Sequence, residues 1–96
     1  MQQADFSTCE RVLSSRWMLS ILWSLQEPQR FGQIQAQLPG LSRGVLAAQL
    51  QELVRMSLVS QTTYMGFPPR VDYTLTEAGQ ELLELLSQLP EMLAAE

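Results

Sequence analysis

The stretch GFPPRVDYTLTEAGQ, residues 66–80, changes character twice along its length and decides the fold. It begins as a proline-rich turn, alternates between apolar and polar residues from Val71 to Leu75, and ends at the start of an acidic helix. Alternation with a period of two is typical of a half-buried strand. Thr76 is a favourable N-cap, and Glu77 follows it where a negative charge stabilises the positive end of a helix. The stretch therefore predicts a stiff loop, a strand and a helix in direct succession.

A second strand is predicted immediately before this loop. Residues 57–65, SLVSQTTYM, are rich in β-branched and aromatic side chains. The intervening GFPP contains too much proline for a two-residue hairpin turn, so the loop should project from the hairpin. We expect Met65 and Phe67, at its tip, to pack back on the sheet. Residues 58–75 are thus predicted to form a β-hairpin, or wing.

Two helices joined by a tight turn are predicted before the hairpin. Residues 32–38 place apolar side chains four positions apart, as one face of a short helix requires. The PGLS segment fixes a turn with proline and glycine, and Ser42 is a good cap for the helix that follows. Leucines recur at helical spacing through residues 42–56. The region from about 32 to 56 therefore has the spacing of a helix-turn-helix.

The first part of the chain is predicted to supply two more helices. Residues 5–14 are suited to a short helix, and residues 16–26 are apolar on nearly every side, as in a central buried helix. Trp17 and Trp23 are expected in the core, with a place in an effector pocket near a dimer contact as the alternative. The predicted class is mainly α with a small β-hairpin, a winged helix-turn-helix.

The last predicted helix, residues 76–94, has an apolar surface too wide for a single stripe. One face can cover the core, which leaves the rest for a partner, and we expect a symmetric homodimer through this helix. Gly79 weakens a helix by about 1 kcal/mol relative to alanine. Close packing against a neighbouring backbone is the predicted reason for this glycine. The residues predicted at the dimer contact are Leu82, Leu85, Leu86, Leu89, Met92 and Leu93.

Length and composition bound the function. The 96 residues, 46% of them hydrophobic, suit one domain over 1–96 with a single core. One cysteine excludes an internal disulfide and fits a reducing cytoplasm. The chain has no histidine, so the usual general base and the common zinc sites are missing. The longest nearly apolar run, WMLSILWSL, is too short to span a bilayer. We expect no enzyme, no metal, no cofactor and no membrane partner.

Charge is unevenly distributed along the chain. Six arginines, no lysine and ten acids give a net charge of −4. Residues 77–96 carry five glutamates and no base, and Glu77, Glu81 and Glu84 are expected on a solvated face. Residues 28–76 carry four arginines against two acids, a surplus of two positive charges. The middle of the chain is therefore the part predicted to face an anion.

Taken together, these segments resemble the HxlR family of bacterial winged-helix transcription regulators, which are relatives of the MarR type. The resemblance spans about residues 12–89 and implies a homodimer. It also implies that the 42–56 helix enters the DNA major groove and that the wing reaches the flanking backbone or the minor groove. The resemblance is carried by RW and the apolar helix after it (16–25), RFGQIQAQLPGLS (30–42), LAAQLQELVRMSLV (46–59) and PPRVDYTLTEAG (68–79).

In a helix-turn-helix the second helix reads the bases. Arg43 and Gln49 are predicted at or near base edges and Ser42 on a phosphate, while small neighbours permit contact with thymine methyl groups. Arg30 and Arg70 are candidate phosphate contacts, with ordinary surface solubility as the alternative. The residues predicted to contact a pseudo-palindromic double-stranded operator are Arg30, Ser42, Arg43, Gly44, Ala47, Ala48, Gln49 and Arg70.

The chain departs from the family pattern on its predicted DNA-facing side. The family usually carries basic or long polar side chains early in the second helix, where this chain has Gly44, Ala47 and Ala48. It commonly has an arginine in the first wing strand where this chain has Gln61. Each lost phosphate contact weakens DNA binding and flattens its salt dependence. The alternative function is a winged helix that docks a protein partner, with weak or no DNA binding.

The single cysteine also departs from the family. Many members carry a redox-sensing cysteine at the position matched here by Ala4, thirteen residues before Trp17, whereas Cys9 lies eight residues before that tryptophan. The sensor role therefore does not carry over by position. Cys9 is predicted to be a small buried apolar residue. A redox role through an intersubunit disulfide is the alternative.

Overall fold

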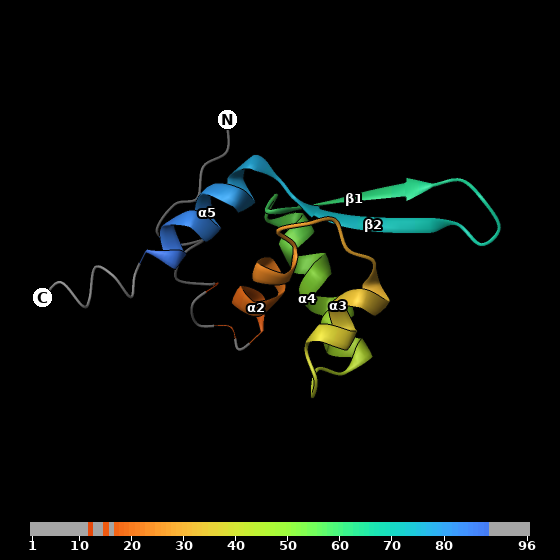
Figure 1. Cartoon of the computed structure of the whole chain (residues 1–96), viewed down its shortest axis with the longest axis horizontal. Helices are drawn as coiled ribbons and strands as arrows, with labels where there is room; N and C mark the ends of the chain where they lie inside the picture. Colours follow the sequence, from red (N-terminus) through yellow and green to blue (C-terminus); the bar gives the residue numbers. More distant parts are fainter. Residues whose placement is uncertain (1–11, 13–14, 16, 89–96) are drawn as a thin grey trace, which may run out of the picture.

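The computed structural model describes residues 12, 15 and 17–88. Over these residues it confirms the predicted class, because four helices and one antiparallel hairpin form a winged helix-turn-helix (Figure 1). The predicted helix at 5–14, apart from buried Val12, lies outside the described residues, as do Cys9 and the last predicted turns of the terminal helix. The elements are α2 (Met18–Ser24), α3 (Phe31–Gln37), α4 (Arg43–Arg55), β1 (Val59–Tyr64), β2 (Arg70–Leu75) and α5 (Glu77–Ser87).

The turn between α3 and α4 has the predicted chemistry. Gly40 adopts a φ of +91°, a conformation that glycine accepts without steric penalty. The Val45 N–H donates to Ser42 Oγ at 3.2 Å, which confirms Ser42 as the N-cap of α4. Buried Leu41 fixes the turn against the core. These local interactions set the angle at which α4 leaves the turn.

The other end of α4 closes through a left-handed residue. Ser57 has a φ of +64°, its N–H donates to the Val54 carbonyl at 3.0 Å, and the Leu58 N–H donates to the Leu53 carbonyl at 3.0 Å. This pair of hydrogen bonds is a Schellman motif, which glycine usually terminates. Thr76 Oγ1 donates to the Ser57 carbonyl at 2.6 Å, so the left-handed turn is also tied to the start of α5.

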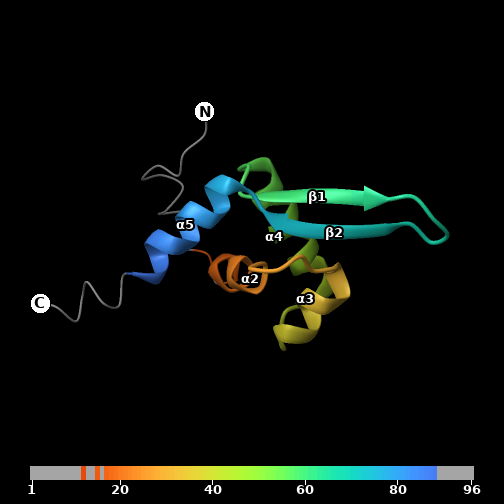
Figure 2. The same ribbon diagram turned by 45° about the horizontal axis from the view of Figure 1, so that its top comes forward.

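The wing is a regular hairpin that projects from the helices (Figure 2). Its register runs from Val59 opposite Leu75 to Tyr64 opposite Arg70. A short third element joins it, because Gln29 and Tyr73 exchange backbone hydrogen bonds of 3.0 and 2.8 Å. This bridge attaches β2 to the connection between α2 and α3.

Two expectations for apolar side chains are wrong. Met65 and Phe67 do not pack back on the sheet, since their exposures are 97% and 104%. The loop carries them beyond the last strand pair, where no sheet surface lies beneath them. Likewise, α2 is not buried on all sides, because the Trp23 side chain remains 56% exposed while Ile21 and Leu22 are fully buried. Only one side of this short helix faces the core.

The core joins the four described helices to the base of the wing. Gly79 is buried beside Leu58, in the connection between α4 and β1, and a Cβ there would overlap the Leu58 carbonyl oxygen and lie 3.1 Å from its carbonyl carbon. The predicted close approach of Gly79 to a neighbouring backbone is thereby confirmed. Fully buried side chains from α2, α3, α4 and α5 form the centre, namely Ile21, Leu22, Ile34, Leu46, Leu53 and Leu82.

Candidate nucleic-acid interface

The exposed side of α4 carries most of the residues predicted to contact DNA. Ser42, Arg43, Gly44, Ala47 and Ala48 are all exposed, on the side of the helix opposite the buried leucines. The Ser42 side chain is already engaged as the cap of α4. Gly44, Ala47 and Ala48 have small side chains, so a groove wall can approach the α4 backbone closely at these positions.

Gln49 occupies a different position from its predicted neighbours. It is half-buried, and its Oε1 accepts a hydrogen bond of 3.2 Å from Ser15 Oγ. Gln51 and Arg55, by contrast, are exposed and continue the line of Gly44 and Ala48. Their separations of four, three and four residues place all four on one helix face. The spacing alone was sufficient to identify Gln51 and Arg55, which the sequence interpretation missed.

The side chain of Arg43 reaches back toward α3. Its guanidinium carbon lies 4.8 Å from the centre of the Phe31 ring, within the range of a cation–π interaction. Phe31 is half-buried at the start of α3. The contact therefore holds a positive charge over the junction between the two helices of the helix-turn-helix.

A cleft of about 720 Å³ separates the wing from the start of α3. Arg30 lies on its helix side and Arg70 on its wing side, with Phe31, Pro68 and Pro69 supplying apolar lining. The two arginines predicted as phosphate contacts thus share one cleft, and Phe31 joins that cleft to Arg43. The exposed start of α4 and the cleft form a continuous surface, here termed the arginine surface.

The charge of Arg70 is compensated within the wing. Arg70 Nε and Nη2 donate to the two carboxylate oxygens of Asp72 at 3.0 and 3.2 Å. Asp72 itself is buried, with an exposure of 7%. The hydrogen bond with Asp72, followed by the Asp72 charge, raises the pKa of Arg70 above its ordinary value. Arg70 therefore stays protonated throughout the working pH range, but its charge is shared with a carboxylate. The sequence offered one signal for this pair, because Arg70 and Asp72 are two residues apart on a strand and therefore lie on the same face.

The other three described arginines differ in whether an acidic residue compensates their charge. Arg55 forms an ion pair with Glu52 on α4. Among the described residues, neither Arg30 nor Arg43 has an ion-pair partner. These two arginines therefore supply the uncompensated positive charge of the arginine surface.

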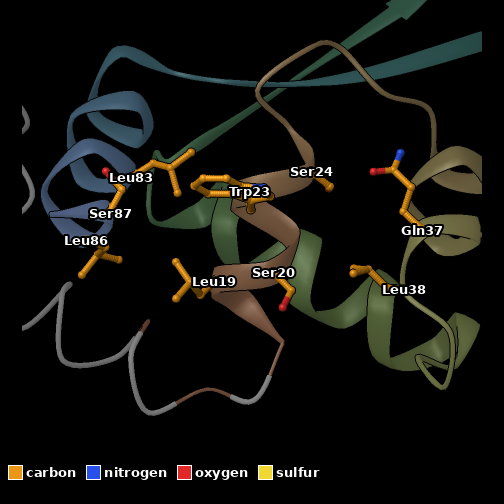
Figure 3. Close-up of a pocket in the computed structure, with 9 residues that line it drawn as sticks. All are labelled: Leu19, Ser20, Trp23, Ser24, Gln37, Leu38, Leu83, Leu86 and Ser87. Atoms are coloured by element: carbon orange, nitrogen blue, oxygen red, sulfur yellow. The ribbon is translucent and has the colours of Figure 1, made fainter. Parts of the chain in front are cut away.

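A second concavity lies between α2, α3 and α5 (Figure 3). Its volume is about 390 Å³. The ring of Trp23 extends from α2 toward Leu83 of α5 and lines this concavity. A role of Trp23 in an effector pocket near a dimer contact stays a prediction. Trp17 packs against the core instead, as predicted. The lining is mostly apolar, with the hydroxyl groups of Ser20, Ser24 and Ser87 among it.

The predicted dimer residues occupy two environments on α5. Leu82 and Leu86 are buried within the chain at 0% and 8% exposure, whereas Leu85 is 53% exposed. Leu85 is therefore the side chain of the three that is available for a contact between subunits. Leu89, Met92 and Leu93 lie outside the described residues. In Figures 1 and 2, α5 lies at the end opposite the wing loop.

Other kinds of site are not found in the part of the chain that the structure describes. Over residues 12, 15 and 17–88, no group of acidic or sulfur side chains is arranged to hold a metal ion. Glu77, Glu81 and Glu84 are exposed on α5. No described helix has the length and apolar character needed to cross a membrane.

A winged helix-turn-helix with an exposed second helix beside an arginine-lined cleft defines a DNA-binding transcription regulator. Comparison with known proteins agrees with this class. The HxlR-like helix-turn-helix family model matches residues 12–95, and the chain belongs to that family. The resemblance inferred from the sequence is thereby confirmed.

Individual relatives are regulators of the same type. YvaP of Bacillus subtilis, an uncharacterized HTH-type transcriptional regulator, is 35% identical over 85 residues, which cover 88% of this chain and 79% of YvaP. A MarR-family regulator from Enterococcus faecalis V583 superimposes with a TM-score of 0.85 at 30% identity, covering 99% of this chain and 91% of the other. The reduced form of YodB from B. subtilis gives a TM-score of 0.82 at 29% identity, covering 95% and 90%. These relatives are regulators, not enzymes.

Proposed function

We propose that this protein acts as a homodimer in which each subunit places α4 in the major groove of one half of a pseudo-palindromic operator. The two half-sites would lie about one helical turn apart, roughly 34–36 Å along the DNA. The observation that carries this proposal is the exposed line of small and polar residues on α4, from Gly44 through Ala48 and Gln51 to Arg55. A helix face of this kind fits against base edges without steric obstruction.

The arginine surface supports contact with phosphates on either side of the bases. Arg43 at the start of α4 and Arg30 in the cleft carry positive charge without an ion-pair partner among the described residues. A dimer would present four such arginines, which gives a slope of log affinity against log salt of roughly −3 to −4. This slope is shallow for a dimeric regulator, so base contacts and shape must supply much of the affinity.

The proposal is tested by fluorescence anisotropy with DNA from upstream of the protein's own gene. Titrations at several salt concentrations should show saturable binding, a stoichiometry of two chains per operator and the shallow slope given above. Circular dichroism of the same sample confirms that the protein is folded. Absence of saturable binding at low salt by folded protein would contradict the proposal.

The same titration distinguishes a DNA-binding regulator from the alternative function, a winged helix that docks a protein partner. A winged helix that serves only to dock a protein would bind operator and unrelated DNA equally weakly, at the level of non-specific attraction. A regulator should prefer its operator over unrelated DNA by roughly a thousandfold or more. The ratio of the two affinities, and not either affinity alone, is the deciding quantity.

A further inference from the structure

The tip of the wing exposes its two largest apolar side chains completely. Met65 and Phe67 have exposures of 97% and 104%, and the loop that holds them is the part of the hairpin farthest from the helices (Figure 2). Single exposed apolar residues are ordinary on protein surfaces. Two fully exposed ones at the end of a projecting hairpin form a shape that suits insertion into a partner.

The wing has no net charge with which to attract phosphates. Residues 57–69 contain no charged side chain, and Arg70 is paired with Asp72. A wing that holds DNA by neutralising phosphates would need free arginine or lysine near its tip. The contact available at this tip is therefore apolar.

The tip is held on a stiff support. The strands pair up to Tyr64 and Arg70, and the Arg70 guanidinium carbon lies 5.6 Å from the centre of the Tyr64 ring. Pro68 and Pro69 restrict the returning side of the loop through their fixed φ. An apolar group on such a support is placed in its partner with little loss of conformational entropy.

We propose that Phe67, assisted by Met65, enters the DNA minor groove beside the half-site as an apolar wedge and partly unstacks one base step. This inference rests on the proposed function. The arginine surface is continuous with the tip through Pro68 and Pro69, which line the cleft that also contains Arg30. The DNA strand next to the wedge would lie in this cleft, with a phosphate at Arg30 and deoxyribose against Phe31.

The wedge has three consequences that phosphate contacts lack. Unstacking is easiest at pyrimidine–purine steps, so the protein should prefer TA or CA at the position under the tip, without a hydrogen bond to either base. The contact is uncharged, so its share of the affinity should not depend on salt. DNA bound in this way bends toward the major groove.

The experiment begins by locating the wing on the operator. Met65→Cys in a Cys9→Ser background, which leaves one thiol per chain, carries a tethered iron chelate that cleaves DNA near the tip. The base at that step is then replaced by 2-aminopurine, whose fluorescence rises when stacking is lost. Wild type, Phe67→Ala, Phe67→Trp and the wing control Ser60→Ala are titrated against this DNA. Ser60 is exposed on β1 and uncharged.

Wild type, Phe67→Trp and Ser60→Ala should all increase the fluorescence of the probe. Phe67→Ala should bind about five- to a hundredfold more weakly, with an unchanged salt slope and no fluorescence increase. The inference is overturned if wild type binds the operator while Phe67→Ala matches it in affinity and fluorescence. It is also overturned if Phe67→Ala loses self-association but keeps its DNA affinity, because the tip would then be a protein contact. Failure of wild type to bind any DNA would instead refute the proposed function.

Discussion

The Arg70 guanidinium is held by the Asp72 carboxylate through two hydrogen bonds, of 3.0 and 3.2 Å. Asp72→Asn should release one positive charge per subunit at the cleft while keeping a hydrogen-bond acceptor. We expect tighter operator binding at low salt and a slope of log affinity against log salt that is steeper by roughly two for the dimer. Salt titrations by fluorescence anisotropy measure both quantities.

A matched control for this change is Glu81→Gln, which removes the same charge from the exposed face of α5. It should leave the slope within experimental error of wild type. Equal slopes for Asp72→Asn and Glu81→Gln would show that the Arg70–Asp72 pair does not face DNA. Raising the pH into the alkaline range should not break the Arg70–Asp72 ion pair, because Asp72 raises the pKa of Arg70 above an already high value.

Gly79→Ala should destabilise the fold even though alanine favours helices. The added Cβ would overlap the Leu58 carbonyl oxygen, and that oxygen also accepts the Thr76 N–H at 3.0 Å. We expect a decrease in the free energy of unfolding of roughly 1–3 kcal/mol, measured by urea denaturation. Gly32→Ala is the control, since nothing lies within 4 Å of a Cβ at that site, and it should be neutral or stabilising.

Ser57→Gly should stabilise the protein, in contrast to Gly79→Ala, which should destabilise it. Ser57 ends α4 with a φ of +64°, which places strain on a residue with a Cβ. Glycine removes the strain and keeps the backbone hydrogen bonds, so the free energy of unfolding should rise by roughly 0.5–1 kcal/mol. Ser57→Ala, which retains the Cβ, should show no such gain. A thermal unfolding series with all three proteins distinguishes these outcomes.

Leu85→Glu should prevent self-association without unfolding the subunit. Leu85 is 53% exposed on α5, so the monomer does not depend on its burial. Two such side chains lost from a symmetric contact should weaken dimerisation at least about a hundredfold. Sedimentation velocity measures this change, with Gln80→Glu, exposed on the same helix, as the charge control. A dimer unaffected by Leu85→Glu would place the contact elsewhere.

The sequence was most informative where a feature is local. Ser42 and Thr76 were recognisable as caps because their side chains accept from N–H groups three residues ahead, at Val45 and Gly79. The need for glycine at position 79 was also correctly inferred, since only a close backbone neighbour explains it. The two wing strands were also recognisable, from their β-branched, aromatic and alternating residues.

Features that depend on tertiary placement were harder to predict. A wide apolar surface on the segment around Trp23 does not reveal which side the other helices cover, so the exposure of that ring was missed. Hydrophobicity likewise suggested burial for Phe67, but the length of the hairpin carries it past any surface. The pairing of Arg70 with Asp72 was readable in principle, because residues two apart on a strand share a face.

The central claim is that the exposed face of α4 contacts DNA, and one substitution addresses it directly. Ala48→Glu places a carboxylate in the middle of that face, while Gln80→Glu makes the same change in charge on α5. Anisotropy titrations with the operator should show at least about a hundredfold weaker binding for Ala48→Glu, through repulsion by phosphates, and binding within about twofold of wild type for Gln80→Glu. Equal operator affinity for the two folded variants would contradict the placement of α4 in the groove.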